Sequence, residues 1–184
     1  MRWILAAVLV LSANAALAQT PAPVAPVAVD VTKADLEATL ARAPAAGVMD
    51  QQIRVVDIGK YNVAVGVLHR AAKAAHTAIA HAQVTEVYYI MQGSGVLVTG
   101  GAIVDAKPVP ADSETARVLV GPSTTGPSIR NGQTRTVSPG DTVVIPPGVA
   151  HWFSSVSADM NYLVVRIDAD HVLPTGYVNA ALKK

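Results

Sequence analysis

The chain has 184 residues, of which 51% are hydrophobic and 15% are charged, and it contains no cysteine. Its length fits one folded domain better than two. The formal net charge of +1 lacks the basic footprint of a nucleic-acid-binding domain, so we expect no nucleic-acid partner. The lack of cysteine excludes disulfides, a lipid-anchored cysteine and any thiolate metal site.

The N-terminus has the pattern of a secretory signal peptide over residues 1–18. A short basic region (1–2) precedes an apolar run (3–11), and residues 16–18 form an A-x-A cleavage site. The apolar run is shorter than the ~20 residues of a membrane-spanning helix. We therefore expect cleavage before Gln19, export to the periplasm or the medium, and no stable membrane anchor afterwards.

Residues 19–30 are rich in proline and alanine, which is typical of an extended linker without a fold of its own. We expect the folded domain to span residues 31–174. Residues 175–184 are then expected to form a C-terminal tail.

A single helix is predicted from about Lys33 to Ala43. Thr32 can cap its N-terminus, with Asp35 three residues further on. Leu36 and Leu40 fall on one face of this helix. We therefore expect it to pack across one end of the domain.

From residue 52 onward, apolar residues recur at every second position in short runs that are separated by turns, which is typical of β-strands. Many short strands with one helix indicate an all-β sandwich or barrel. A stretch rich in Pro, Ser, Thr and Gly (105–133) contains one strand-like island at 116–120. The other predicted strands cover residues 52–58, 62–70, 84–91, 95–99, 134–137, 142–145, 151–155 and 162–168.

Strand alternation also predicts which side chains face the interior. It places His69 and three valines on one face, and we expect that face to point into the barrel, where His69 is a core residue or a wall of the substrate pocket. Tyr88 and Tyr89 are adjacent, as are Trp152 and Phe153, so one member of each pair should face inward. Tyr88 and Phe153 are our candidate pocket residues.

Two segments, residues 81–95 and 140–151, combine turn residues with possible metal ligands. Gly93 allows the chain to reverse between two strands. Pro146-Pro147-Gly148 forms a rigid turn that ends one strand and sets the direction of the next, which begins at His151. A side chain placed directly after such a corner can be held at low entropic cost.

Together the two segments resemble the two motifs of the cupin family. The first motif is His-x-His, three or four residues, Glu, six residues and Gly; the second is Gly, five residues, Pro-x-Gly, two residues, His, three residues and Asn. The resemblance covers roughly residues 60–168 and implies a cupin-type double-stranded β-helix, which is a jelly-roll barrel. The matching positions are His81, Glu86, Gly93, Gly140, Pro146, Gly148 and His151.

The resemblance implies that His81, Glu86 and His151 hold one divalent transition-metal ion. Two imidazoles and a carboxylate without a thiolate suit Fe, Mn, Zn, Ni or Cu. Three ligands leave open positions for water, O₂ or a substrate, as in the oxygenases that use two histidines and one carboxylate. Glu86 is also our candidate catalytic base, should it leave the metal during a reaction.

The sequence departs from the family motifs at two positions. Ile79 stands where the leading His of the first motif would fall, and Ser155 stands where the closing Asn of the second would fall. A fourth ligand could come from His76, if the chain bends, or from Gln83. A turn or bulge is also required between His81 and Glu86, because plain alternation over five residues places them on opposite faces.

Two classes of function follow from the resemblance. The first is an enzyme that acts on a small molecule: we expect a non-haem metal-dependent dioxygenase-like enzyme, with an isomerase or lyase as the alternative. The second is a non-catalytic protein that binds or senses a small molecule or a metal. The motifs do not decide whether the chain is an enzyme, because one fold supports many chemistries.

The long segment from about Ile103 to Arg135 separates the two motifs by more residues than a hairpin needs. We expect it to cover the mouth of the barrel and to determine the substrate. A homodimer is expected by analogy with the family alone.

Overall fold

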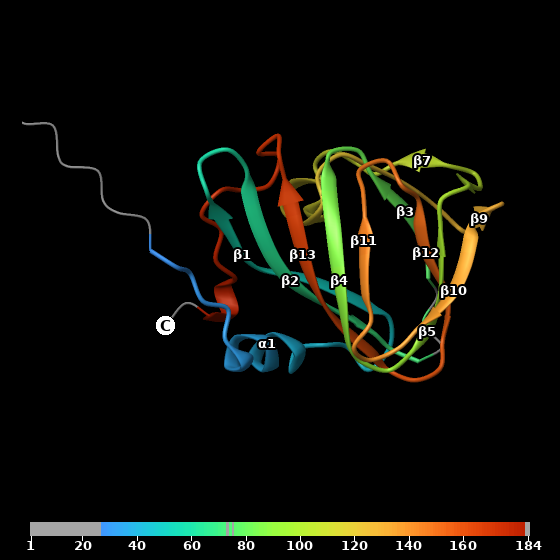
Figure 1. The fold of residues 1–184 in the computed structure, drawn as a ribbon, viewed down its shortest axis with the longest axis horizontal. Coiled ribbons are helices and arrows are strands. Elements are labelled where there is room, and N and C mark those ends of the chain that lie inside the picture. The colour runs from blue at the N-terminus through green and yellow to red at the C-terminus, as the bar shows by residue number, and fades with distance from the viewer. Residues whose placement is uncertain (1–26, 73, 75, 183–184) are drawn as a thin grey trace, which may run out of the picture.

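Alternating apolar residues build two antiparallel sheets that pack face to face as a barrel (Figure 1). The computed structural model describes residues 27–72, 74 and 76–182. Side chains on the inner faces of both sheets form the main core. The all-β architecture with one short α-helix in the described residues confirms the predicted fold class. The predicted signal peptide and most of the linker lie outside the described residues.

The first sheet has five strands, and its order places distant parts of the sequence side by side. β13 lies between β2 and β4, so the last strand of the chain occupies the centre of this sheet. In sheet order the strands are β1 (Val48–Asp57), β2 (Asn62–Arg70), β13 (Met160–Asp168), β4 (Val84–Gln92) and β11 (Thr142–Ile145).

The second sheet has six strands, and a separate two-stranded ribbon is formed by β6 (Ala102–Ile103) and β9 (Ile129–Arg130). Both motifs contribute strands to this sheet. In sheet order its strands are β10 (Gln133–Val137), β5 (Gly95–Thr99), β12 (His151–Val156), β3 (Ala78–His81), β8 (Ser123–Gly126) and β7 (Lys107–Pro108).

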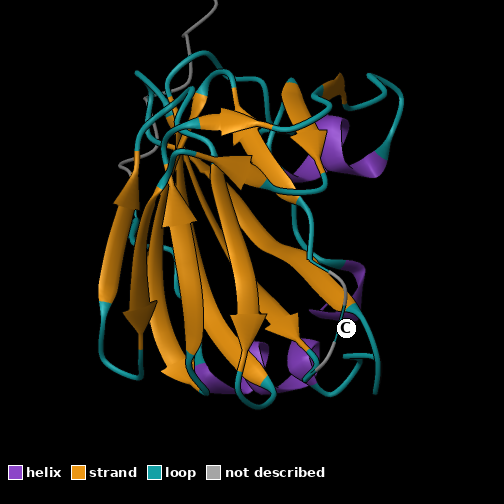
Figure 2. Ribbon diagram, turned by 90° about the vertical axis from the view of Figure 1, so that its right-hand side faces the viewer, coloured by secondary structure: helices purple, strands orange, loops and turns teal. Residues whose placement is uncertain are grey.

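The helix α1 spans Lys33–Leu40 and begins with the predicted capping box between Thr32 and Asp35. It contacts β1, β2 and the short C-terminal 3₁₀ helix η2 (Ala180–Leu182), so it lies across one end of the first sheet (Figures 1 and 2). Residues 176–179 hydrogen-bond along the edge of β1, so this part of the C-terminal tail packs against the barrel. Within the described residues, no helix has the length and apolar character to cross a membrane.

The prediction for the strand face that includes His69 is wrong. The neighbouring Leu68 belongs to the barrel core, whereas the Nδ1 atom of His69 lies 2.8 Å from Oδ1 of Asn161 on the outer face of the sheet. The period of two was correct, but both faces of β2 carry apolar side chains, and α1 also contacts this strand. Alternation therefore could not identify the inner face, and His69 is not a wall of the interior.

The segment between the motifs also differs from the prediction. The strand-like island at residues 116–120 is a turn of π-helix, η1 (Thr115–Leu119), which buries Ala116 and Leu119. Their spacing of three residues matches one helical turn. The segment then continues into β8, which pairs with β3 and so brings residues after the helix beside the first motif.

Candidate metal centre

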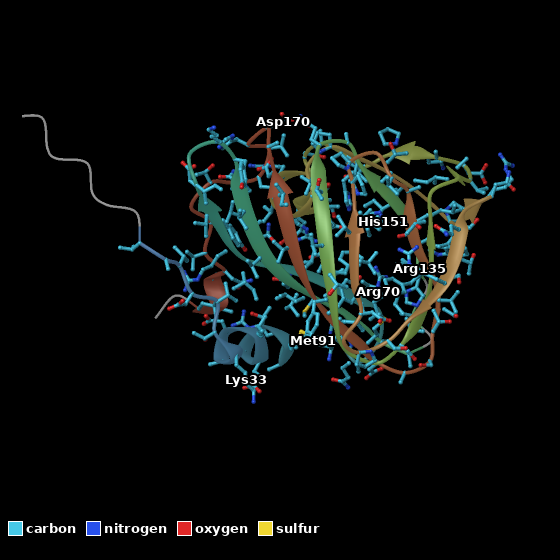
Figure 3. The ribbon with its side chains drawn as sticks, in the orientation of Figure 1. Lys33, Arg70, Met91, Arg135, His151 and Asp170 are labelled. Atoms are coloured by element: carbon cyan, nitrogen blue, oxygen red, sulfur yellow. The ribbon has the colours of Figure 1, made fainter. Side chains whose placement is uncertain are left out.

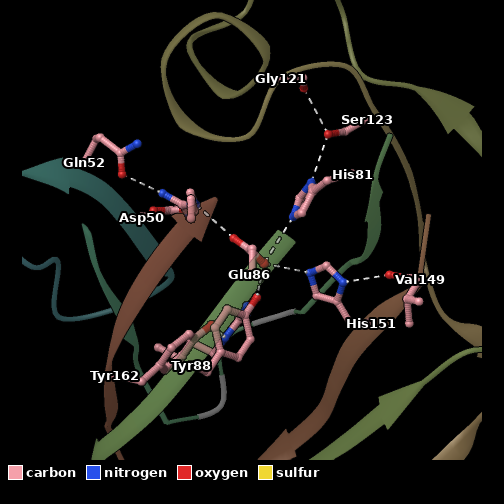
Figure 4. Close-up of polar contacts among 12 residues, drawn as sticks. Asp50, Gln52, His81, Glu86, Tyr88, Gly121, Ser123, Val149, His151 and Tyr162 are labelled. Atoms are coloured by element: carbon pink, nitrogen blue, oxygen red, sulfur yellow. Dashed lines mark hydrogen bonds and ion pairs between the residues drawn. The ribbon is translucent and has the colours of Figure 1, made fainter. Parts of the chain in front are cut away.

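The three predicted metal ligands meet in the interior of the barrel. His81 ends β3 and His151 begins β12 in one sheet, while Glu86 lies on β4 in the opposite sheet (Figure 4). The Oε2 atom of Glu86 lies 3.3 Å from Nε2 of His81 and 3.4 Å from Nε2 of His151. All three residues are buried, and their candidate ligand atoms lie within 4.8 Å of one another.

Two local features of the backbone bring these residues together. β3 ends at His81, and the chain bends before β4 begins, which supplies the turn that the sequence requires between His81 and Glu86. The Pro146-Pro147-Gly148 corner joins β11 to β12. Gly148 has a φ of 77°, and its N–H donates to the carbonyl of His81 over 2.7 Å. The corner therefore fixes the start of β12 against the end of β3.

Hydrogen bonds to the second nitrogen of each imidazole fix the tautomers. Nδ1 of His151 lies 3.1 Å from the carbonyl of Val149, which can only accept, so Nδ1 carries the proton. Ser123 donates its hydroxyl to the carbonyl of Gly121, so it accepts from Nδ1 of His81 over 2.9 Å. In both neutral imidazoles the lone pair of Nε2 therefore points at the carboxylate of Glu86.

The result is a cluster of acceptor atoms that face one another without a donor between them. Such a cluster needs a cation, either a proton on an imidazole or a metal ion. Burial lowers the pKa of His81 and outweighs the opposing effect of Glu86, which disfavours the proton. Two imidazoles and a carboxylate, each held by a further hydrogen bond, therefore fit a divalent transition-metal ion.

Glu86 is held as an anion. Its Oε1 accepts from Nε of Arg166 over 2.9 Å, and its Oε2 accepts from the hydroxyl of Tyr88 over 2.6 Å. Burial alone would raise the pKa of Glu86, but the neighbouring His81 and Arg166 hold it well below its usual value. A carboxylate with a lowered pKa is a weak base, so this geometry suits a ligand better than a proton carrier.

Arg166 is the main polar residue of the site that the sequence analysis missed. Its side chain is fully buried and donates to Glu86, to Gln52 over 3.0 Å and to Asp50 over 2.5 Å. Burial lowers the pKa of Arg166, but the two carboxylates outweigh it and raise the pKa. No sequence motif marks this residue, because β13 reaches β4 only through the strand order, where Arg166 pairs with Glu86.

Two buried polar atoms beside Arg166 have no hydrogen-bond partner among the described residues. They are Oδ1 of Asp50 and Nε2 of Gln52. One accepts and the other donates, so a water molecule or the hydroxyl of a ligand would satisfy either atom. This polar corner lies on β1, opposite the strands that carry the two histidines.

The structure does not bring a fourth ligand to the triad. Nδ1 of His76 accepts from Arg70 over 3.3 Å, and the side-chain amide of Gln83 donates to Asp170 over 3.0 Å. Neither residue joins the cluster, so both suggestions for a fourth ligand are wrong in this geometry. Ile79 pairs with His151 across β3 and β12, so an apolar side chain occupies the position of the missing histidine.

The two aromatic candidates do face the interior. Tyr88 and Phe153 are both buried in the main core, whereas their neighbours Tyr89 and Trp152 are more exposed. The ring of Tyr88 lies 4.7 Å from that of Tyr162, and its hydroxyl reaches Glu86. These aromatic side chains therefore fill the barrel on one side of the triad.

The segment between the motifs contributes Ser123 to the site and forms a cavity beside it. A cavity of about 490 Å³ lies between this segment and Val172, and a second of about 360 Å³ reaches His81. Pro122 and Ser123 line both cavities. The segment therefore reaches the second nitrogen of a candidate ligand, which the sequence did not indicate.

Comparisons with known proteins identify one family. A family model described as Cupin matches residues 59–183 of the chain. Among curated proteins, none matches the sequence.

Several solved structures resemble the chain weakly. Recombinant oxalate oxidase in complex with glycolate is 20% identical with a TM-score of 0.43, over 69% of this chain and 53% of that chain. The chain thus spans about half the length of that protein. The DMSP lyase DddQ from Ruegeria pomeroyi DSS-3 is 14% identical with a TM-score of 0.44, over 75% of this chain and 54% of that one. The polyketide cyclase RemF from Streptomyces resistomycificus is 16% identical with a TM-score of 0.43, over 77% and 80%.

Proposed function

The chain belongs to the cupin family, and we propose that it binds one divalent transition-metal ion on His81, Glu86 and His151 and acts on a small molecule at that ion. The arrangement of acceptor atoms is the observation that carries the proposal. Two Nε2 lone pairs and a carboxylate oxygen converge in a buried site, and each ligand is oriented by a separate hydrogen bond. Ligands that are each held by a further hydrogen bond are typical of metal centres.

The reaction that we propose is dioxygenase-like. Arg166 donates a hydrogen bond to Oε1 of Glu86, so Oε2 is the carboxylate oxygen that would bind the ion. Two imidazoles and one carboxylate oxygen then leave open positions on an octahedral ion, and iron bound there would supply the chemistry of O₂ activation. Glu86 stays ionised and Tyr88 stays protonated, since burial and Glu86 raise the pKa of Tyr88 well above its usual value. Neither group needs to exchange a proton to hold the ion.

A non-catalytic function is the second candidate, and one observation favours it. Ile79 faces the same side of the sheet as His151, where the family motif has a histidine. A site with three protein ligands binds metal less tightly than one with four. Binding or sensing of a metal or a small molecule would need no turnover, and bound zinc without O₂ consumption would favour this alternative.

Elemental analysis of the mature protein, residues 19–184 purified without chelator, tests the metal site. We expect about one equivalent of metal in the parent, and loss of that metal in Glu86→Gln and His151→Ala. Glu114→Gln and His171→Ala are matched controls, because both residues are exposed. Circular dichroism would verify that each variant is folded. Absence of metal after reconstitution with Fe(II), Mn(II), Zn(II) or Ni(II), or equal metal in all variants, would refute the proposal.

Export and self-association are further parts of the proposal. Export is supported by the sequence of residues 1–18 and predicts that periplasmic or secreted protein begins at Gln19, which intact-mass spectrometry measures. A homodimer would depend on the apolar outer face of the first sheet, and light scattering of the purified chain measures it. The large apolar side chains exposed there are Tyr89, Met91, Val144 and Ile167.

A further inference from the structure

Arg70 lies on the inner face of the barrel, where it is held by aromatic side chains. Arg70 follows Leu68 of the core by two residues on β2, so both side chains point to the same face. Its Nε donates to the hydroxyl of Tyr162 over 3.0 Å. Its guanidinium lies 4.9 Å from the ring centre of Phe153 and 5.8 Å from that of Tyr162. In Figure 3, Arg70 lies below His151 within the outline of the barrel. A planar cation over aromatic rings is thereby fixed in one orientation.

Arg70 is connected to the candidate metal centre through two tyrosines whose rings pack at an angle of 49°. The ring of Tyr162 packs against that of Tyr88 at 4.7 Å, and the hydroxyl of Tyr88 donates to Glu86. All these side chains project from the inner face of the first sheet. The two tyrosine side chains therefore connect Arg70 to the carboxylate of Glu86.

Arg70 lacks the kind of partner that Arg166 has. Arg166 meets the carboxylates of Asp50 and Glu86, whereas no Asp or Glu in the described part of the chain forms an ion pair with Arg70. Its Nη1 meets the neutral nitrogen of His76 at 3.3 Å, and Nη2 makes no hydrogen bond to any described residue. A partly buried guanidinium is stabilised by an anion, and its two terminal nitrogens match a carboxylate in geometry.

The charges inside the barrel favour an anionic ligand once a metal is bound. Among the inward-facing side chains that are buried or half-buried, three carboxylates balance three guanidinium groups, so a divalent ion leaves this set with an excess of positive charge. Arg135 belongs to this inward-facing set because it pairs with Leu97 of the core, and its side chain donates to the hydroxyl of Thr99 over 3.1 Å. The six inward residues are Asp50, Glu86, Asp168, Arg70, Arg135 and Arg166.

We infer that Arg70 binds the carboxylate of a small organic acid, which is the substrate or ligand of the metal centre. The inference rests on the proposed function, since it assigns a ligand class to that same site. The carboxylate accepts from Nη2 and Nη1 of Arg70, and the carbon skeleton packs on Phe153. Arg70 thus selects acids over neutral molecules of the same shape, while His81, Glu86 and His151 hold the ion.

Calorimetric titration of the Zn(II)-loaded mature protein tests this role with matched probes. Malonate, succinate and glutarate are compared with their neutral diamides, which have the same skeletons. We expect at least one acid to bind, and its diamide and the Arg70→Met variant each to show affinity lower by about tenfold or more. The exposed Arg130→Met variant should bind the acid as the parent does. Zinc content is measured in every sample.

Three results would overturn the inference: equal affinity for acid and diamide, no binding of any acid up to about 10 mM, or parental affinity in Arg70→Met. Failure to take up Zn(II) would instead refute the proposed function, and the same comparison on the metal-free protein would still decide the role of Arg70.

Should Arg70→Met fail to fold, the parent protein provides an independent test. Phenylglyoxal modifies accessible arginines, and mass spectrometry locates the product. We expect the acid that binds most tightly to protect Arg70 and not Arg130, and its diamide to protect neither residue. Equal modification of Arg70 with and without the acid would overturn the inference.

Discussion

Replacement of Arg166 by methionine tests whether the buried ion cluster supports both the fold and the ligand Glu86. The guanidinium is fully buried and donates to two carboxylates and one amide oxygen. Methionine has a similar length but no donor. The change therefore leaves the carboxylates of Glu86 and Asp50 facing each other without the cation between them.

The expected loss in the free energy of unfolding is about 3–5 kcal/mol, which is typical when one partner of a buried ion pair is removed. Asp50 remains 22% exposed and can regain water, and Tyr88 still donates to Glu86, so we do not expect a larger loss. A domain of this size is stable by about 5–15 kcal/mol, so the variant should still fold.

The dependence on pH separates an electrostatic cause from a packing cause. In the parent the pKa of Glu86 lies below its unfolded value, so its contribution to stability is present at neutral pH and is lost as the pH falls. Without Arg166, burial dominates and raises that pKa. The penalty is then present at neutral pH and is relieved by protonation in acid. The stability difference between parent and variant should therefore shrink as the pH falls.

Urea unfolding of the metal-free proteins at about pH 7.5 and about pH 5 measures both effects. The exposed Arg130→Met variant is the matched control and should unfold with the parent. A loss in Arg166→Met of less than about 1 kcal/mol, or a loss of equal size at both pH values, would refute the reasoning.

Three further substitutions probe the metal centre and the barrel. Ser123→Ala removes the acceptor that orients His81, so metal affinity should fall by about 10-fold to 100-fold in a chelator competition assay; unchanged affinity would contradict this role. Ile79→His places a nitrogen beside His151 and should raise metal affinity in the same assay; unchanged or lower affinity would contradict this expectation. Gly93→Ala should lower the urea midpoint by more than the exposed Ala111→Gly control, because Gly93 has a φ of 74° and a Cβ would lie 2.4 Å from the carbonyl oxygen of Asp159.

The sequence by itself determined the features that depend on near neighbours. The capping box at Thr32 requires only residues three apart, and the helix begins where it predicts. Strands such as β2, β5 and β11 have the predicted bounds, because period-two alternation and flanking turn residues are local signals. The motif spacings also placed His81, Glu86 and His151 in one cluster, since a rigid corner and a bend are encoded beside them.

Only the tertiary structure decided which face of each strand is inside. Leu68 and His69 are equally consistent with alternation, and only the packing of the two sheets against each other places Leu68 in the core. The helical turn over residues 115–119 was likewise hidden, because a short apolar run fits a strand or a helix until its packing partners are known.

The partners of Glu86 were also decided by the tertiary structure. Arg166 is 80 residues from Glu86 in the sequence and reaches it because β13 pairs with β4, and Asp50 reaches Arg166 from β1 across β2 in the same sheet. Contacts of this range depend on strand order, which no local pattern encodes. The sequence thus specified the candidate metal ligands, while the fold supplied the charges around them.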